Sequence, residues 1–486
     1  MSDLARIIDA LTGTQVLCLG DAMLDRFVHG TVERISPEAP IPVLRIEREV
    51  SMLGGAGNVA ANVAALGCVA RFVSVVGDDA IGDDILHRLV EEGLADGCHI
   101  VTEPGRQTPR KTRYLAANQQ LLRADRERVA PLTTSSTEVV LGAARALLGE
   151  VAAVVLSDYG KGTLTETLLA TLIPAAIAAG RPVVVDPKGS DYRRYRGASV
   201  VTPNRKELSQ ATGGMPVGND DDIVVAARWL IADCGLGAVV ATRSEQGMTV
   251  VTAAGEVAHL PAAAREVYDV SGAGDTVAAT LAAALGAGAS LIEAARVANL
   301  AAGIVVGKVG TAVARQSELL ATLHEQEWRV GESKVATLDA ALERVERWRR
   351  RGLKAGFTNG CFDLLHPGHV SLLAQARAAC DRLVVGLNSD ESVRRLKGEK
   401  RPVQSEAARA AVLASLASVD LVVIFGEDTP LETITALRPD LLVKGADYRL
   451  EQVIGGDVVH SYGGRVLLAD LQAGHSTTAT IARMGA

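Results

Sequence analysis

Short apolar runs alternate with helix-like stretches along most of the chain. In the first half, the runs end in turns or in polar residues such as Asp21 and Asp186. Continuous apolar strands separated by helices are typical of parallel sheets that are covered on both faces. The pattern therefore predicts an α/β fold whose ligands bind beyond the carboxyl ends of strands. The clearest runs are Val16–Gly20, Ala152–Leu156, Val183–Val185, Val200–Val201 and Ala238–Ala241.

The pattern changes at two places along the chain. Between His29 and Val50, prolines and alternating apolar and charged residues predict a small β flap. Strand signals are lacking over Leu319–Lys334, and a charged amphipathic helix is predicted over Leu338–Arg351. We therefore predict a first domain over 1–330, a linker and helix over 331–350, and a second domain over 351–486. Strand-like runs restart at Ala355 and recur at Leu383–Leu387, Leu421–Phe425, Leu441–Val443 and Val466–Leu468.

Composition narrows the class of protein. The chain has 486 residues, 48% of them apolar, which is enough for two domains with their own cores. A formal charge of −7 argues against a nucleic-acid-binding protein. The six cysteines form no CxxC pair, which favours reduced thiols. The longest uncharged stretch, Thr276–Ile292, is short for a membrane span and predicts a buried helix and a turn. We expect a cytoplasmic protein that binds neither nucleic acid nor membranes.

A glycine-rich turn carries the strongest chemical signal of the first half. Gly272, Ala273 and Gly274 precede a helix that is predicted to begin near Asp275. Small residues let a phosphate reach backbone N–H groups at the positive end of a helix, which together form an anion hole. Asp275 can then accept the proton of an attacking hydroxyl as a general base. The alternative is a simple tight turn in which Asp275 caps the helix.

A second glycine-rich segment precedes a helix predicted over Val59–Leu66. Its glycines allow a ligand to approach the backbone, and an asparagine amide can both donate to and accept from sugar hydroxyls. Basic residues near strand ends or the flap are either phosphate ligands or ordinary solvated charges, and these are Arg113, Arg123, Lys188 and Arg243. The predicted sugar-binding residues are Asp21, Asp25, Gly54, Gly55, Asn58 and Lys188.

Two motifs together resemble the signature regions of the ribokinase-like (PfkB) carbohydrate kinase family. They are GGAGNVAANVAALG at 54–67 and DVSGAGDT at 269–276, and the resemblance extends over about residues 10–320. It implies a ribokinase-like fold with Asp275 as the base and the anion hole at Gly272–Asp275. It also implies Mg²⁺, held with the ATP phosphates near Asn204 and Glu207, because phosphoryl transfer demands charge neutralisation. The ATP-binding residues that it implies are Asn204, Arg205, Lys206, Glu207, Thr242, Gly247 and Asn299.

The second half opens with NGCFDLLHPGHVSLL at 359–373. A strand is predicted to end at Thr358 and a helix to begin around Gly368, so that His366 and His369, three residues apart, can face one point. Two imidazoles and the helix N-terminus can stabilise charge on the α-phosphate of a nucleoside triphosphate. Zinc ligation and a purely structural role are the alternatives, but no third ligand cluster lies nearby in the sequence.

This pattern resembles the HxGH nucleotidyltransferase superfamily, in its cytidylyltransferase-like branch, over about residues 350–486. The resemblance implies a Rossmann-like domain with a basic loop at 394–402 and a Ser/Thr element before the last helix. A basic run would otherwise be a solvated face. The Gly474-His475 pair before Ser476 departs from the family pattern. The nucleotide-binding residues implied are Phe357, Asn359, Gly360, Asp363, Gly368, Lys397, Arg401, Lys444, Asp447, Ser476, Thr477 and Thr478.

The order of the two domains resembles the bifunctional heptose-phosphate kinase and adenylyltransferase family, as do ISPEAPIPV at 35–43 and NQQLLRAD at 118–125. It implies phosphorylation of D-glycero-β-D-manno-heptose 7-phosphate at O1 by ATP with Mg²⁺. Adenylyl transfer from ATP to the 1-phosphate then gives ADP-heptose and pyrophosphate for the lipopolysaccharide core. The flap suggests a homodimer through the kinase domain. The alternatives are another sugar or polyol kinase fused to a cytidylyltransferase, and a non-catalytic ligand sensor.

Overall fold

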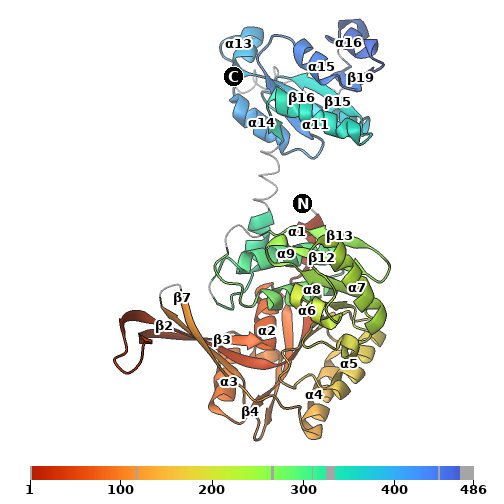
Figure 1. The fold of residues 1–486 in the computed structure, drawn as a ribbon. Coiled ribbons are helices and arrows are strands. Elements are labelled where there is room, and N and C mark those ends of the chain that lie inside the picture. Colours follow the sequence, from red (N-terminus) through yellow and green to blue (C-terminus); the bar gives the residue numbers. More distant parts are fainter. Residues whose placement is uncertain are drawn as a thin grey trace. The chain divides into compact units, whose positions relative to one another are not determined.

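The computed structural model describes residues 3–116, 119–263, 267–308, 310–323, 334–446 and 449–470. The chain divides into two compact units, Met1–Leu323 and His324–Ala486, and each is described by itself (Figure 1). Among the described helices, none combines the length and the apolar character that a membrane span needs. All six cysteines are free thiols, as expected.

A largely parallel sheet forms the centre of the first unit, as the apolar runs predict. Among the described residues its order is β13-β12-β11-β10-β9-β8-β1-β4-β5. The strands from β11 to β5 are parallel, whereas β12 and β13 add an antiparallel edge. The strands are β1 (Gln15–Gly20), β4 (Val69–Gly77), β5 (Cys98–Glu103), β8 (Ala153–Ser157), β9 (Val183–Asp186), β10 (Val200–Val201), β11 (Ala238–Thr242), β12 (Met248–Thr252) and β13 (Val257–Leu260).

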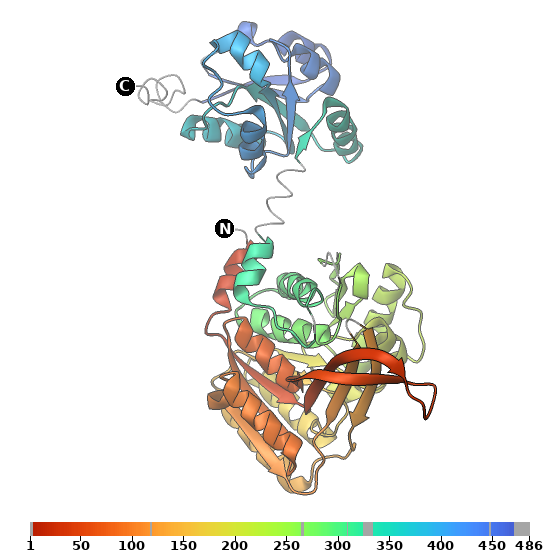
Figure 2. The ribbon, with the colours of Figure 1, turned by 90° about the vertical axis from the view of Figure 1, so that its left-hand side faces the viewer.

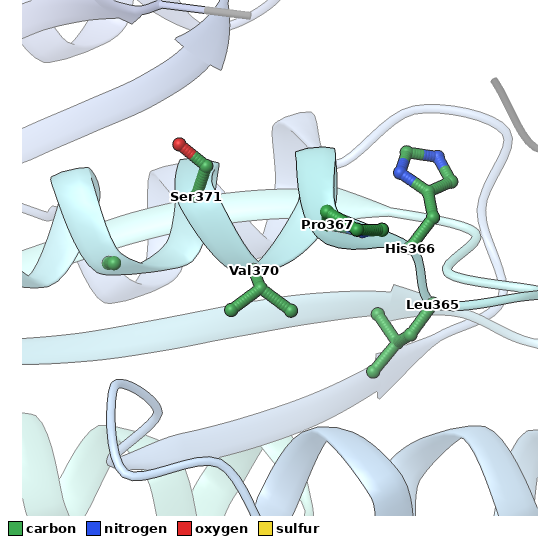
Figure 3. A pocket seen from close by; sticks show the side chains of 6 residues that line it. Leu365, His366, Pro367, Val370 and Ser371 are labelled. Carbon is green, nitrogen blue, oxygen red and sulfur yellow. The ribbon is translucent and has the colours of Figure 1, made fainter. Parts of the chain in front are cut away.

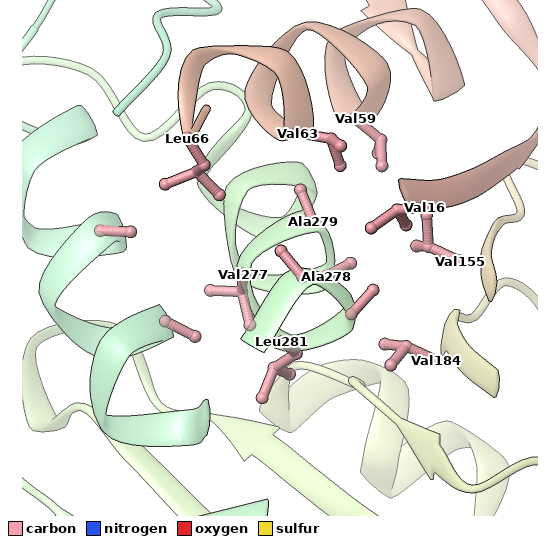
Figure 4. Close-up of a cluster of buried hydrophobic side chains, with 14 of the residues drawn as sticks. Val16, Val59, Val63, Leu66, Val155, Val184, Val277, Ala278, Ala279 and Leu281 are labelled. Carbon is pink, nitrogen blue, oxygen red and sulfur yellow. The ribbon is translucent and has the colours of Figure 1, made fainter. Parts of the chain in front are cut away.

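Helices cover both faces of this sheet (Figures 1 and 2). The predicted uncharged helix is α8, which lies beside α2 on one face of the sheet; in Figure 4, side chains of both helices point toward Val16 of β1 and Val184 of β9. α4, α5 and α7 pack on the opposite face. The helices are α1 (Asp3–Ala10), α2 (Ala56–Ala65), α3 (Ala80–Glu91), α4 (Thr134–Leu147), α5 (Glu166–Ala178), α6 (Arg205–Ala211), α7 (Asp220–Cys234), α8 (Ala273–Gly286) and α9 (Leu291–Val305).

The flap is larger than the sequence predicts. It is a sheet in the order β3-β2-β6-β7 that projects from the first unit (Figure 1). β6 lies parallel to β2, which places Lys111 beside Asp25, and the register of β2 with β3 slips at His29 and again near Val32. β6 and β7 contain many charged residues and therefore lack the alternation of apolar and polar residues that would have predicted them as strands. The strands are β2 (Ala22–Ile35), β3 (Pro42–Gly55), β6 (Arg110–Ala116) and β7 (Gln119–Arg126).

The second unit is built on a parallel sheet of the order β14-β17-β16-β15-β18-β19, as a Rossmann-like domain requires. β15 continues two residues beyond the predicted end at Thr358. The strands of the second unit are β14 (Val335–Ala336), β15 (Ala355–Gly360), β16 (Arg382–Asn388), β17 (Leu421–Phe425), β18 (Leu441–Gly445) and β19 (Arg465–Ala469). Its helices are α11 (Leu338–Arg350), α12 (Pro367–Ala378), α13 (Asp390–Lys397), α14 (Glu406–Ala414), α15 (Leu431–Leu437) and α16 (Gly456–Ser461).

Candidate active sites

Asp275 lies on the first turn of α8 and is only 2% exposed. Both of its carboxylate oxygens accept a hydrogen bond from a side chain of another element. The Asn58 amide on α2 donates to Oδ2 at 2.8 Å, and the Tyr159 hydroxyl, from the loop after β8, donates to Oδ1 at 2.9 Å. Two donors from separate elements hold the carboxylate in one orientation.

The pKa of Asp275 is raised to about 7, because burial penalises its charged form. The hydrogen bonds from Asn58 and Tyr159 act in the opposite direction, since both stabilise the carboxylate. The negative charge of Asp25 raises the pKa further, whereas the positive charge of Lys111 lowers it. A carboxyl group that titrates near neutral pH suits general-base chemistry.

The turn before α8 has room for a phosphoryl group. Gly272 has a φ of 78°, and a Cβ at this position would lie 2.7 Å from Nδ2 of Asn58. A Cβ at Gly274 would meet just one described atom within 4 Å, namely Oδ2 of Asp186 at 3.9 Å. The helix begins at Ala273, two residues earlier than predicted, so its first N–H groups face this open space.

The helix of the first signature also begins earlier than predicted, at Ala56 rather than Val59, so Asn58 lies on its first turn. Asn62, one turn further on, donates to the Asn58 carbonyl at 2.9 Å and accepts a hydrogen bond from Thr276 of α8 at 2.8 Å. These buried amides bind α2 to α8. The signature therefore sets the position of the base in addition to any contact with sugar.

The glycines and aspartates predicted to bind sugar have close partners within the protein. A Cβ at Gly54 would lie 2.5 Å from Oδ2 of Asp25, and a Cβ at Gly55 would lie 2.4 Å from the carbonyl oxygen of Asp21. These two glycines therefore allow the end of β3 to pack closely against the start of β2. Asp25 is buried and accepts a hydrogen bond from Arg113 of β6 at 2.6 Å.

Asp21 anchors a loop. Its carboxylate accepts hydrogen bonds from the backbone N–H groups of Tyr159, Lys161 and Thr163, each at 2.9 Å. Asp21 therefore positions the loop that carries Tyr159, in addition to the predicted binding of sugar hydroxyls.

The predicted ATP-binding residues gather at the ends of β10 and β11, with one exception. The Asn204 side chain caps α6, and the Asn204 N–H donates a hydrogen bond to the Glu207 carboxylate at 3.1 Å. The Lys188 ammonium donates to the same carboxylate at 3.1 Å. Arg205 contacts Gln246, and Lys206 is exposed. Asn204 pairs with Thr242, and Gly247 (φ 88°) closes the next turn. Asn299 lies apart on α9 and donates to the Pro261 carbonyl at 2.7 Å.

Sequence reasoning missed three residues of this site: Lys111, Tyr159 and Asp186. Asp186 is the last residue of β9, and its pKa is raised well above the usual range by burial and then by the charges of Asp275 and Glu207. Thr202 donates to its Oδ1 at 3.1 Å. The position of Asp186 at a strand end was the available signal. Nothing in the sequence marked Tyr159 or Lys111.

The two histidines of the second unit stack at the start of α12. Their ring centroids are 3.8 Å apart with an interplanar angle of 19°, and Phe362 packs against His369 at 5.2 Å. The pKa of His369 is lowered to about 4, chiefly by burial and then by the charge of His366. His369 is therefore neutral at physiological pH. The predicted meeting of both rings at one point is confirmed.

A pocket of about 670 Å³ lies along the first turns of α12. Figure 3 shows the ring of His366 at its edge, beside Pro367, where the helix begins. Gly368 is buried. The pocket is lined by Leu365, His366, Pro367, Val370, Ser371 and Ala374. Of the two histidines, His366 is the one that lines this pocket.

Several residues predicted to bind nucleotide shape the loops around the histidines. Asp363 is buried, contacts Arg401, and accepts from the N–H groups of Val403 at 2.7 Å and Gln404 at 3.2 Å. It therefore fixes the basic loop after α13. Lys397, at the end of α13, is exposed.

The remaining predicted residues of this unit follow β15 and β18. Lys444 donates to the Asn359 carbonyl at 3.3 Å, next to Gly360. Phe357 is fully buried in the core, so a nucleotide at this position would contact its backbone rather than its side chain. Asp447, Ser476, Thr477 and Thr478 lie outside the described residues.

Arg409 is a further residue whose role the sequence left open. Its side chain is fully buried, and its Nη1 donates to the carbonyls of Cys361 at 2.6 Å and Asn388 at 2.9 Å. Its Nη2 donates to Asp390 at 2.7 Å. One guanidinium thus ties together the loops that follow β15 and β16.

The two units match two family models. A model of the pfkB family carbohydrate kinases matches residues 13–318, and a cytidylyltransferase-like model matches residues 357–469. The bifunctional protein HldE of Paramagnetospirillum magneticum is 62% identical over 484 residues, which cover 100% of this chain and 99% of that protein. The bifunctional protein HldE of Rhodospirillum rubrum is 61% identical, with coverage of 99% and 97%. The chain belongs to the bifunctional HldE family. It is accordingly a bifunctional kinase and nucleotidyltransferase, as the two sets of motifs predict.

Solved structures resemble the first unit of this HldE family member. Phosphofructokinase-2 from Escherichia coli aligns with a TM-score of 0.54 at 22% identity, over 65% of this chain and 99% of that chain. A ribokinase-like protein from Agrobacterium tumefaciens, described as a putative ribokinase, aligns with a TM-score of 0.52 at 20% identity, over 65% and 99%. At these identities the likeness shows the fold alone. It confirms the predicted ribokinase-like architecture.

Proposed function

We propose that the first unit phosphorylates O1 of D-glycero-β-D-manno-heptose 7-phosphate with ATP. The product carries phosphates at both C1 and C7, so a separate phosphatase must first hydrolyse the 7-phosphate. In the second unit, the remaining heptose 1-phosphate then attacks ATP and forms ADP-heptose and pyrophosphate for the lipopolysaccharide core. The observation that carries the kinase step is the buried Asp275, held by two donors beside an open glycine turn. The choice of heptose and of ATP at the second site is supported by the resemblance to the HldE family.

In the kinase step, Asp275 accepts the proton of the sugar hydroxyl. The hydroxyl oxygen forms a bond to the γ-phosphorus of ATP, and the bond between the γ-phosphorus and the oxygen that leaves with ADP breaks. The backbone N–H groups at the start of α8 stabilise the charge on the transferred phosphoryl group. Asn58 and Tyr159 keep the carboxylate aimed at the hydroxyl. The pKa of Asp275, about 7, lets a large share of the base be ionised at neutral pH.

Kinase chemistry of this kind needs Mg²⁺ with ATP, and the buried carboxylates fit it. In the described part of the chain no cluster of three or more metal-ligating side chains occurs. Mg²⁺ commonly takes one or two protein carboxylates together with substrate phosphates and water. Asp186 and Glu207 would hold it, since burial and then the negative charges of Asp275 and Glu207 raise the pKa of Asp186, and a cation there would offset both effects. Asn204 is less suited because its side-chain oxygen caps α6. The ion would neutralise charge on the ATP phosphates.

In the transferase step, an oxygen of the sugar 1-phosphate attacks the α-phosphorus of ATP, and pyrophosphate leaves. The stacked rings of His366 and His369 stand at the N-terminus of α12. A neutral imidazole donates one hydrogen bond, and the helix N-terminus adds its dipole, so both stabilise negative charge on the phosphates. No proton has to be transferred in this step.

The proposed reactions are tested by mass spectrometry of the products formed from heptose 7-phosphate, ATP and Mg²⁺, with and without pyrophosphatase. We expect heptose 1,7-bisphosphate from the chain alone, and ADP-heptose once a phosphatase that removes the 7-phosphate is added, with more ADP-heptose when pyrophosphate is removed. Replacement of ATP by CTP at the second step should give no nucleotide sugar. Products from a different sugar, a CDP-sugar, or no product with any nucleotide would support the other fused kinase or the ligand sensor instead.

We also propose that the flap joins two copies of the chain in a homodimer. Apolar side chains of the flap are strongly exposed, among them Ile35 (61%), Ile46 (53%) and Leu122 (59%). Clustered exposed apolar side chains are typical of protein interfaces. Sedimentation velocity of the full chain should give the mass of a dimer, and Ile35→Glu combined with Ile46→Glu should shift it to a monomer.

A further inference from the structure

The flap carries a lysine that faces the kinase site without an acidic partner. Lys111 lies on β6 and is half-buried. Its Nζ stands over the ring of Tyr159, 4.9 Å from the centroid. Within the described residues it forms neither an ion pair nor a hydrogen bond. Burial lowers its pKa, although the charges of Asp25 and Asp125 act against this shift.

The other basic residues considered for a sugar phosphate are already neutralised. Each forms an ion pair with an aspartate or glutamate, so binding an anion would require that pair to be broken or shared. The pairs are Arg113 with Asp25 at 2.6 Å, Arg123 with Asp125 at 3.0 Å, Lys188 with Glu207 at 3.1 Å, and Arg243 with Asp220.

Tyr159 connects Lys111 to the base. The ring of Tyr159 lies beneath the ammonium group, and its hydroxyl donates to Asp275 at 2.9 Å. A sugar whose reacting hydroxyl sits at Asp275 would therefore extend along the ring of Tyr159 toward Lys111. The phosphate at the far end of a sugar that reacts at its anomeric oxygen would then lie on the side of Lys111.

We propose that Lys111 binds the phosphomonoester of the sugar substrate and makes the kinase site selective for a sugar phosphate over the free sugar. The inference rests on the proposed kinase reaction and assigns the residue that recognises the second end of its substrate. A partly desolvated ammonium without a counter-ion is costly to keep, and a phosphate dianion would neutralise it. The transferred phosphoryl group of ATP is the other possible anion, and the test separates the two.

The test compares Lys111→Met and Lys111→Arg with a matched control, Arg26→Met. Arg26 lies on β2 of the same sheet, adjacent to Asp25 in sequence and therefore on the opposite face, and is paired with Glu49. Steady-state kinetics of the full chain are measured with heptose 7-phosphate and with unphosphorylated heptose. Binding of both sugars without ATP is measured by the shift in melting temperature.

We expect Lys111→Met to raise KM for heptose 7-phosphate roughly 10- to 100-fold, the effect of losing one charged hydrogen bond, while KM for ATP stays unchanged. KM for unphosphorylated heptose should stay near its wild-type value, so that the preference for the phosphorylated sugar collapses. Lys111→Arg should retain most of this preference because it keeps the charge. Arg26→Met should behave as the wild type does.

Two results would overturn the inference. One is an unchanged preference for the phosphorylated sugar in Lys111→Met. The other is an equal loss of kcat with both sugars, which would place Lys111 on the transferred phosphoryl group. Failure of the proposed function looks different: the wild type would turn over neither sugar. If the wild type then still showed a thermal shift with heptose 7-phosphate that Lys111→Met lost, the phosphate site would stand without the reaction.

Discussion

At the residue scale, the behaviour of the kinase depends on how one carboxyl group is held. Burial raises the pKa of Asp275 to about 7, and hydrogen bonds from Asn58 and Tyr159 prevent a larger rise. A base must be deprotonated to act, so kcat/KM of the kinase should increase with pH and level off above about 7. The transferase should not follow this profile, because His369 remains neutral throughout that range.

Tyr159→Phe tests this dependence with a small change. The variant keeps the ring beneath Lys111 but removes the hydroxyl that donates to Asp275. Because that hydrogen bond favours the ionised carboxylate, its loss should raise the pKa of Asp275 and move the kinase pH profile to higher pH. The pH dependence of kcat/KM measures the shift, with the transferase profile of the same chain as the control. A profile that stays in place or moves to lower pH would contradict this role for Tyr159.

At the element scale, the start of α8 has two glycines with different tasks. Gly272→Ala would place a Cβ in a left-handed residue and 2.7 Å from Asn58. We expect a loss of about 1–2 kcal/mol of stability together with loss of kinase activity. Gly274→Ala meets no close atom, so its stability should stay within about 1 kcal/mol of the wild type. Its methyl group would nevertheless fill the phosphoryl space and abolish phosphorylation.

Thermal unfolding and kinase assays of the two variants distinguish a structural from a chemical role for this turn. The transferase activity of each variant reports on the integrity of the second unit. If Gly274→Ala phosphorylates sugar at the wild-type rate, the anion hole does not lie at this turn.

Elements were predictable from the sequence where one local pattern specifies them. The buried strands read as apolar runs because both faces of the sheet are covered, and β1, β9 and β17 appear within a residue of their predicted positions. β6 and β7 escaped prediction because polar side chains line them and because β6 joins the flap by pairing with β2, which is distant in sequence, while β7 pairs with β6.

The residues of the candidate sites likewise fall into those that a short motif predicts and those that only the fold brings to the site. Asp275, His366 and His369 follow short motifs whose geometry is local, so the sequence reveals them. Tyr159 and Lys111 reach the site only through the fold, from a loop and from a flap strand. Asp21 and Phe357 show what a motif does not reveal, because Asp21 also anchors a loop and the side chain of Phe357 lies in the core.

At the scale of the whole molecule, each active site is built from residues of its own unit. The first site uses α2, α8, the flap and the loop after β8, and the second uses β15, α12 and the loops around them. Since the candidate residues of each site come from one unit, the two proposed steps should be separable by substitution.

Asp275→Asn should lower kinase turnover by about 10²–10⁴, because it removes the base while preserving size, and should leave adenylyl transfer to supplied heptose 1-phosphate intact. His369→Ala should do the reverse, with a loss of about 10²–10³ in pyrophosphate release. Assays of each step alone measure both effects.

Mixing these two variants tests the central claim, two nucleotide-using sites that act in series, most directly. Each variant alone, supplied with heptose 7-phosphate, ATP, Mg²⁺ and a phosphatase that removes the 7-phosphate, should form almost no ADP-heptose in the mass spectrum. An equimolar mixture should form it, because the bisphosphate released by His369→Ala is hydrolysed to heptose 1-phosphate, which Asp275→Asn uses. ADP-heptose from either variant alone at the wild-type rate, or none from the mixture, would contradict the account.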